Sequence, residues 1–306
     1  MSAATESESG IICCASCGIA GGEDIKLRKC TACYLVSYCG VTCQKAHRKQ
    51  HKGECKKRAA ELRDELLFKQ PEGRCDGDCP ICILPLPIDN RDSTMMECCS
   101  KFICDGCSHA NEIRENEMRL QHACPFCRKP CPETEEEAVK QRMKRIETND
   151  PVAICQQGGS HFRRGDYSDA FKWYTKAVKL GNVRAHCNLA HMYHEGLGVE
   201  KHEGKETYHL EEAAIGGHVV ARHNLGCEEW NVGNAKRAVK HWMIGAALGF
   251  DLSIKDLMDA FREGVVSKED LDVALRAHKA AVDETKSPQR NEAEELFRRK
   301  GNPNWT

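Results

Sequence analysis

The sequence lacks the features that would place it in a membrane or mark it for export. It has no apolar run of about 18 residues, the length that spans a bilayer, and no short apolar segment typical of a secretion signal. Its formal net charge is −1, so the basic excess typical of nucleic-acid-binding proteins is missing. We therefore expect an intracellular protein, cytoplasmic or nuclear, with neither a membrane nor a nucleic acid as partner.

A self-contained catalytic constellation is also missing. Cysteine and histidine often lie near each other, but nearly all of these pairs fall into arrays with the spacing of metal ligands. A thiolate inside a closed four-ligand site is a poor nucleophile. We predict no catalytic side chain, and we expect function to come from binding surfaces.

Cysteine, by contrast, is abundant, with 21 residues in a chain of 306. Repeated C-x2-C pairs without a secretion signal favour metal binding in a reducing compartment over a disulfide scaffold. A tight turn between such cysteines brings both thiolates to the zinc bonding distance of about 2.3 Å. The cysteines therefore predict zinc sites.

The first array, residues 14–55, offers eight ligands for two zinc ions. Its last two pairs have the wider x3 spacing that places ligands one helical turn apart, which predicts a helix around residues 41–57. The pairs are Cys14 and Cys17, Cys30 and Cys33, Cys39 and Cys43, and His51 and Cys55.

With its Tyr38-Cys39 dipeptide and Cys43-Gln44 step, this array resembles the MYND finger, a peptide-binding family. The resemblance implies two interleaved sites. One comprises Cys14, Cys17, Cys39 and Cys43, and the other comprises Cys30, Cys33, His51 and Cys55.

Two alternatives remain open in this array, since Cys13 competes with Cys14 and His47 competes with His51. Arg48 stands where the family usually carries a tryptophan in its final helix. This departure bears on the peptide groove rather than on the zinc ligands.

The second array again offers eight ligands for two ions, with a vicinal cysteine pair in its middle. It resembles the RING finger, whose first and third ligand pairs share one ion while the second and fourth share the other. His122 is an alternative to one member of the vicinal pair. The implied sites are Cys79, Cys82, Cys104 and Cys107, and Cys98, Cys99, Cys124 and Cys127.

RING proteins act as ubiquitin ligases by holding a ubiquitin-charged conjugating enzyme beside a substrate, which supplies proximity rather than covalent chemistry. The resemblance implies that Ile81, Pro125 and Arg128 contact the conjugating enzyme. Asn111 stands where active members often carry a tryptophan or another apolar residue. Together with Arg48, it keeps open the alternative of a non-enzymatic zinc-binding scaffold for protein partners.

From residue 151 the chain repeats itself with a period of 36, so that Ala177 aligns with Ala213 and Asn188 with Asn224. Such a period indicates paired helices stacked into a solenoid. With the GLGV turn at 196–199, the region resembles Sel1-like repeats. We expect the helices to end in left-handed glycines at Gly181, Gly216 and Gly249.

Other residues of the repeats are expected to be structural. Three neighbouring histidines, at 186, 191 and 194, have no thiolate or carboxylate partner nearby in the sequence, so we do not expect them to bind metal. The expected core residues are Trp173, Tyr174, Trp242, Cys155, Cys187 and Cys227.

The sequence thus predicts a multidomain protein in which two small cross-brace zinc fingers with four structural zinc ions precede an all-α solenoid. We expect a ubiquitin ligase that binds a conjugating enzyme through the RING-like finger and recruits protein or peptide partners through the repeats and the MYND-like finger. The linker helix after the second finger is expected to be solvated. The predicted segments are a tail (1–12), MYND-like finger (13–58), helical linker (59–74), RING-like finger (75–131), linker helix (132–150), Sel1-like repeats (151–250), and capping helices with a tail (251–306).

Overall fold

The structure is a computed structural model in which residues 12–299 are described, so the tail expected at residues 1–12 lies outside that range except for its last residue. The chain forms two compact units that divide between Lys69 and Gln70. Within the described range, no helix combines the length and the apolar composition needed to span a bilayer.

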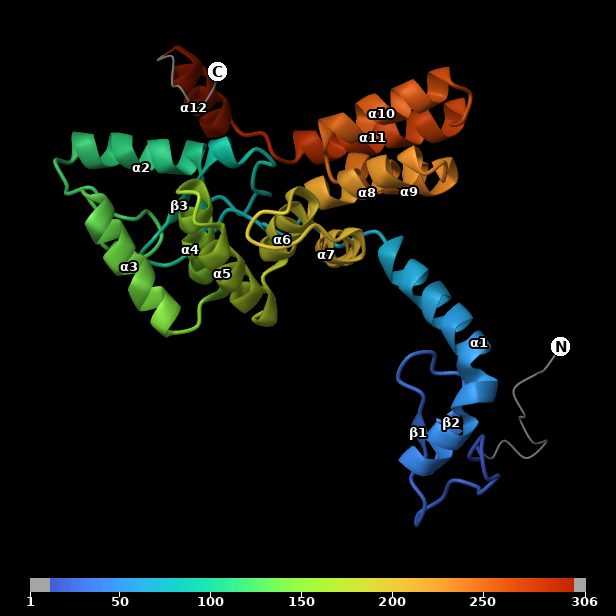
Figure 1. Cartoon of the computed structure of the whole chain (residues 1–306). Coiled ribbons are helices and arrows are strands. Elements are labelled where there is room, and N and C mark those ends of the chain that lie inside the picture. The colour runs from blue at the N-terminus through green and yellow to red at the C-terminus, as the bar shows by residue number, and fades with distance from the viewer. Residues whose placement is uncertain (1–11, 300–306) are drawn as a thin grey trace. The chain divides into compact units, whose positions relative to one another are not determined.

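The first unit holds the first cysteine array and one long helix (Figure 1). Two short antiparallel strands, β1 (Arg28–Lys29) and β2 (Ser37–Tyr38), pair within the array. Helix α1 (Val41–Leu67) runs without a break through the predicted finger helix and most of the predicted linker. It is rich in strong helix formers, and the first proline of the chain is Pro71, so no residue interrupts it.

The second unit begins with the RING-like finger. A short 3-10 turn, η1 (Asn90–Asp92), leads into an antiparallel hairpin of β3 (Ser93–Met96) and β4 (Lys101–Cys104). Helix α2 (Asp105–Glu117) follows β4 directly. This order places the vicinal cysteines in the hairpin turn and the next cysteine pair where the helix begins.

The repeats follow as helical hairpins. Consecutive helices pack as pairs, and each pair packs on the next. From residue 151 to residue 283 the helices are α4 (Pro151–Arg163), α5 (Tyr167–Lys179), α6 (Val183–Glu195), α7 (Glu203–Ile215), α8 (Val219–Asn231), α9 (Ala235–Ala247), α10 (Asp251–Arg262) and α11 (Lys268–Asp283).

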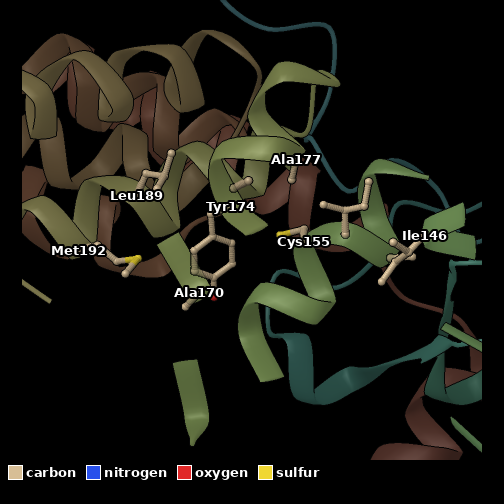
Figure 2. Close-up of a cluster of buried hydrophobic side chains, with 10 residues drawn as sticks. Ile146, Cys155, Ala170, Tyr174, Ala177, Leu189 and Met192 are labelled. Carbon is tan, nitrogen blue, oxygen red and sulfur yellow. The ribbon is translucent and has the colours of Figure 1, made fainter. Parts of the chain in front are cut away.

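Small and aromatic side chains together form the core of the first repeat. Figure 2 shows Tyr174 of α5 near Ala170 and Leu189, and all three belong to one buried cluster. Ala177 and its repeat equivalent Ala213 are fully buried, which lets the paired helices approach closely. Tyr174 and Trp242 lie in the core as predicted, whereas Trp173 is only half-buried.

Left-handed glycines end seven of the eight helices from α4 to α11, but at one of the three predicted positions the neighbouring glycine takes this conformation. Gly181 (φ 82°) and Gly249 (φ 88°) are confirmed, whereas the prediction for Gly216 is wrong because its φ is −73°. Gly217 (φ 84°) takes that role, one period of 36 after Gly181. Gly216 instead permits close packing, since a Cβ there would lie 2.7 Å from Val183 Cγ2.

Helix α3 (Glu135–Glu147) lies between the RING-like finger and the repeats. It begins at the predicted cap, where Thr134 Oγ1 accepts a hydrogen bond from the Glu137 backbone N–H at 3.2 Å. The prediction of a solvated helix is wrong. Ile146 belongs to the core of the first repeat, and Arg142 is 5% exposed.

The last helix, α12 (Pro288–Arg299), packs against α2 of the RING-like finger, whereas α10 and α11 pack on α9 at the end of the repeats. Close approach requires Gly106 of α2, because a Cβ there would lie 2.7 Å from the Arg290 backbone nitrogen. The Arg290 guanidinium donates to the carbonyl oxygens of Pro85 at 2.7 Å and Leu84 at 3.2 Å. The C-terminal helix α12 therefore packs directly against the RING-like finger.

Two adjacent glycines of α4 should respond oppositely to alanine. A Cβ at Gly158 would lie 2.8 Å from the buried Tyr174 ring, so Gly158→Ala should lower the free energy of unfolding by about 1–3 kcal/mol through overpacking. A Cβ at Gly159 would meet ordinary contacts of 3.6–3.7 Å, so Gly159→Ala should raise it by roughly 0.5–1 kcal/mol through helix propensity. Urea unfolding followed by tryptophan fluorescence checks both, and equal effects would contradict this packing.

Candidate metal centres and the adjoining surface

Strand β2 and the start of α1 bring together the first ligand group of the N-terminal array. The Cys17 and Cys39 sulfurs lie 3.6 Å apart, and those of Cys39 and Cys43 lie 3.5 Å apart. With Cys14, which is 2% exposed, all four sulfurs lie within 4.8 Å of one another. Cys43 lies in the first turn of α1, whereas Cys39 directly follows β2 and precedes the helix.

The second group of this array joins the β1–β2 hairpin to the middle of α1. Cys33 Sγ lies 3.2 Å from His51 Nε2, and Cys30 Sγ lies 3.8 Å from Cys55 Sγ. All four donor atoms lie within 4.8 Å of one another, and His51 is 6% exposed. The finger is thus held together by two interleaved groups.

The two competing residues of the array have other contacts. His47 Nδ1 lies 3.1 Å from the Tyr38 hydroxyl, and its ring stacks on His51 with centroids 5.8 Å apart. Cys13 forms a backbone bridge with Ala20. Neither belongs to the two groups described above, which contain Cys14 and His51.

The RING-like finger brings its eight cysteines into two further groups. In the first, Cys82 Sγ and Cys104 Sγ lie 3.8 Å apart. In the second, Cys98 Sγ lies 3.3 Å from Cys127 Sγ, and Cys99 Sγ lies 3.8 Å from Cys124 Sγ. The groups are Cys79, Cys82, Cys104 and Cys107, and Cys98, Cys99, Cys124 and Cys127.

Both vicinal cysteines lie in the second group, and His122 has a different partner. Its Nδ1 lies 2.8 Å from Glu115 Oε2, and Glu115 is 4% exposed. Burial acts to raise the pKa of Glu115, but hydrogen bonds from His122, Asn111 and the Ala123 backbone N–H outweigh it and lower that pKa. The histidine is therefore engaged with an ionised carboxylate.

These four groups fit zinc. A tetrahedral ion with zinc–sulfur bonds of about 2.3 Å separates its sulfur donors by about 3.7 Å, close to the measured values. Each group consists of four thiol or imidazole donors, the set found in structural zinc sites. Bound zinc would supply folding energy to loops that bury little apolar surface.

A shallow pocket of about 360 Å³ lies on the RING-like finger between its two ligand groups. It brings together Ile81, Pro125 and Arg128, the three residues predicted to contact a conjugating enzyme, with Gln289 of α12 at its margin. Ile81 is 42% exposed and Arg128 is also exposed, whereas Pro125 is buried at the pocket lining. Residues 47 positions apart in the chain thus share one surface.

Asn111 has a role that the sequence did not reveal. It is 8% exposed and donates through Nδ2 to Glu115 Oε1 at 2.8 Å and to the Ala123 carbonyl oxygen at 3.3 Å. Its Oδ1 accepts a hydrogen bond from Arg128 Nη1 at 3.0 Å. The residue that departs from the family pattern therefore fixes the position of Arg128. The sequence signal for this role was the amide itself, because an asparagine side chain can both donate and accept hydrogen bonds.

Partly buried ion pairs connect the finger to the helices that follow it. Arg142 of α3 donates to both carboxylate oxygens of Glu97 at 2.6 and 3.0 Å, and to Gln157 and Ser160 of α4 at 3.3 and 2.8 Å. Arg184 of α6 donates to Asp76 at 2.5 Å. No local sequence pattern indicates such pairs, because the partners lie far apart in the chain.

The three histidines of α6 have different neighbours. His186 Nδ1 lies 2.9 Å from His209 Nδ1, His194 Nδ1 lies 2.7 Å from Glu206 Oε1, and the His191 ring contacts Phe162. Each of the three side chains therefore contacts a different residue of the repeats.

Comparisons with known proteins found a family match for the first finger and similar solved structures. Residues 14–55 match the MYND finger family, and no curated protein matches the chain. The chain is similar to a solved Sel1 repeat protein from Oxalobacter formigenes, with 22% identity and a TM-score of 0.43 over 57% of this chain and 71% of that one.

A second solved structure, c5321, is titled a protective antigen present in uropathogenic Escherichia coli strains displaying an SLR fold. It is 21% identical with a TM-score of 0.39, over 55% of this chain and 37% of that one. The resemblance to the MYND finger is confirmed, and so is the predicted fold class of cysteine-rich fingers followed by a helical solenoid.

Proposed function

We propose that this protein is a RING-type ubiquitin ligase whose helical repeats and MYND finger recruit protein partners. The observation that carries the proposal is the pocket on the second finger, where Ile81, Pro125 and Arg128 converge. Zinc fingers and helical repeats are interaction modules, and the pocket adds a candidate surface for a conjugating enzyme.

The proposed ligase acts by position rather than by covalent chemistry. Ile81 and Pro125 supply apolar contact between the ligand groups, and Arg128 offers a planar fork that can donate to two carbonyl groups at once. Asn111 holds that guanidinium beside the pocket. Four structural zinc ions, two in each finger, would keep the loops that carry these side chains in place.

The contacts between the finger and the repeats support this proposal because they fix the position of the finger relative to the repeats. The Arg142–Glu97 and Arg184–Asp76 pairs join the finger to α3, α4 and α6 within one compact unit. A partner bound to the repeats would then be held within a limited range of distances from the ubiquitin-loaded conjugating enzyme. Restricting that distance raises the effective concentration of the acceptor lysine.

Autoubiquitination with a panel of conjugating enzymes tests the proposal. The intact chain should form ubiquitin chains with at least one enzyme, and Ile81→Ala and Arg128→Ala should abolish them while the zinc content is unchanged. Ile83→Ala is the matched control, because Ile83 is 68% exposed and lies two residues from Ile81 but outside the pocket. It should retain activity.

The alternative is a non-enzymatic scaffold in which every module only binds proteins. It is favoured by Arg48 and Asn111, which stand where MYND and RING fingers usually carry a tryptophan or another apolar residue. If no enzyme of the panel supports ubiquitin transfer while all zinc sites are filled, the ligase proposal fails and the scaffold is the better account.

A further inference from the structure

A further cluster of metal-ligand side chains lies in the repeats, outside both fingers. It consists of His223 and Cys227 of α8 and Asp256 of α10. His223 Nε2 lies 3.5 Å from Cys227 Sγ and 3.7 Å from Asp256 Oδ2, and Cys227 Sγ lies 3.7 Å from the same carboxylate oxygen. The three donor atoms therefore form a nearly equilateral triangle.

The size of this triangle fits one zinc ion. With bonds of about 2.3 Å to sulfur and about 2.0–2.1 Å to nitrogen and oxygen, tetrahedral geometry separates such donors by about 3.3–3.6 Å. The measured separations agree within a few tenths of an ångström. They also fall within the 3.2–3.8 Å range found between donors of the finger groups.

The helical part of the cluster repeats an arrangement already present in the MYND finger. His223 and Cys227 are separated by three residues on α8, as His51 and Cys55 are on α1. One helical turn brings both donors to the same side of the helix. No local spacing points to the third donor, because Asp256 lies 29 positions further along the chain than Cys227.

A buried serine orients the imidazole of His223. Ser253 Oγ lies 3.4 Å from Nδ1, which leaves Nε2 facing Cys227 and Asp256. Ser253 is fully buried, and α9 approaches it so closely that a Cβ at Gly245 would lie 2.4 Å from Ser253 Oγ. A hydrogen-bonded second ring nitrogen is typical of metal-ligating histidines.

We propose that His223, Cys227 and Asp256 bind a Zn²⁺ ion, with a water molecule as the fourth ligand. The mixed nitrogen, sulfur and oxygen set suits zinc, and the two anionic ligands balance its charge. The Asp256 side chain is 28% exposed, so water reaches the site. Since α8 and α10 both pack on α9, the ion would tie the last repeat to the helix that covers it.

Zinc analysis of the full-length chain tests this site. The chain and its variants are equilibrated with excess Zn²⁺, freed of unbound metal by gel filtration, and analysed by mass spectrometry for zinc per chain. Asp256→Asn and Cys227→Ala should each bind one zinc ion fewer than the unmodified chain. The difference between variants is the readout, so the result does not depend on how many ions the fingers hold.

Cys187→Ala is the matched control, because Cys187 is a half-buried cysteine of the equivalent repeat helix α6 and lies outside the cluster. It should retain the full zinc content. Circular dichroism confirms that Asp256→Asn, which has nearly the same shape as the wild-type residue, keeps its helices. Equal zinc content in the folded Asp256→Asn variant and the unmodified chain would overturn the proposal.

Discussion

Cys104→Ser should abolish zinc binding by the RING-like finger and unfold it. Cys104 is fully buried, ends β4 and precedes α2, so its thiolate belongs to the ligand group on which the hairpin and the helix converge. Structural zinc contributes an apparent folding free energy of about 10–16 kcal/mol in small fingers, far more than the apolar core of such a segment. The second group should fail too, because the same hairpin carries two of its ligands.

Zinc per chain, measured by mass spectrometry, and hydrogen exchange across residues 79–128 check this result. Cys131→Ser is the matched control, since Cys131 is a half-buried cysteine of the same segment that belongs to neither RING-like ligand group. The control should keep its zinc and its exchange protection. A Cys104→Ser variant with full zinc content and a protected hairpin would contradict the assignment of this group.

Arg142→Met should destabilise the second unit by about 3–5 kcal/mol. The guanidinium is 5% exposed and forms a two-point contact with Glu97, whose side chain is 16% exposed. Its loss would leave that carboxylate without its partner and would also remove the hydrogen bonds to Gln157 and Ser160. Removing one partner of a buried pair costs more than the pair contributes, because the remaining charge stays desolvated.

Denaturant unfolding followed by tryptophan fluorescence measures this loss, because all four tryptophans lie beyond residue 172 and report only on the second unit. Lys144→Met is the control, since Lys144 lies on the same helix and is exposed. It should change the free energy of unfolding by less than about 0.5 kcal/mol. If both variants unfold alike, Arg142 does not connect the finger to the repeats as described.

The sequence predicted those features that depend on local spacing. Examples are the C-x2-C pairs, the x3 spacing of His51 and Cys55 on α1, and the cap at Thr134. Each involves residues within a turn or two, so its geometry follows directly from backbone preferences. The period of 36 likewise predicted the helical hairpins, because each repeat must bury its apolar face on the next.

Features that depend on distant partners were beyond prediction from sequence. In the sequence Arg142 is one of several cations on an expected solvated helix, and only the fold places Glu97 beside it. Likewise, only the fold shows that Asn111 accepts a hydrogen bond from Arg128. The return of α12 to α2 joins segments more than 170 residues apart. The glycine at the end of α7 was misplaced by one position because two glycines adjoin there, although the period of 36 from Gly181 points to Gly217.

The most direct test of the proposed function is single-turnover discharge of ubiquitin from a charged conjugating enzyme to free lysine. Using an enzyme chosen from the panel, the rate is measured without the chain, with the intact chain and with Arg128→Ala. The account predicts that the intact chain accelerates discharge at least roughly tenfold by fixing the reactive geometry, and that Arg128→Ala with full zinc content does not. Equal rates with and without the zinc-loaded chain, for every enzyme of the panel, would contradict it.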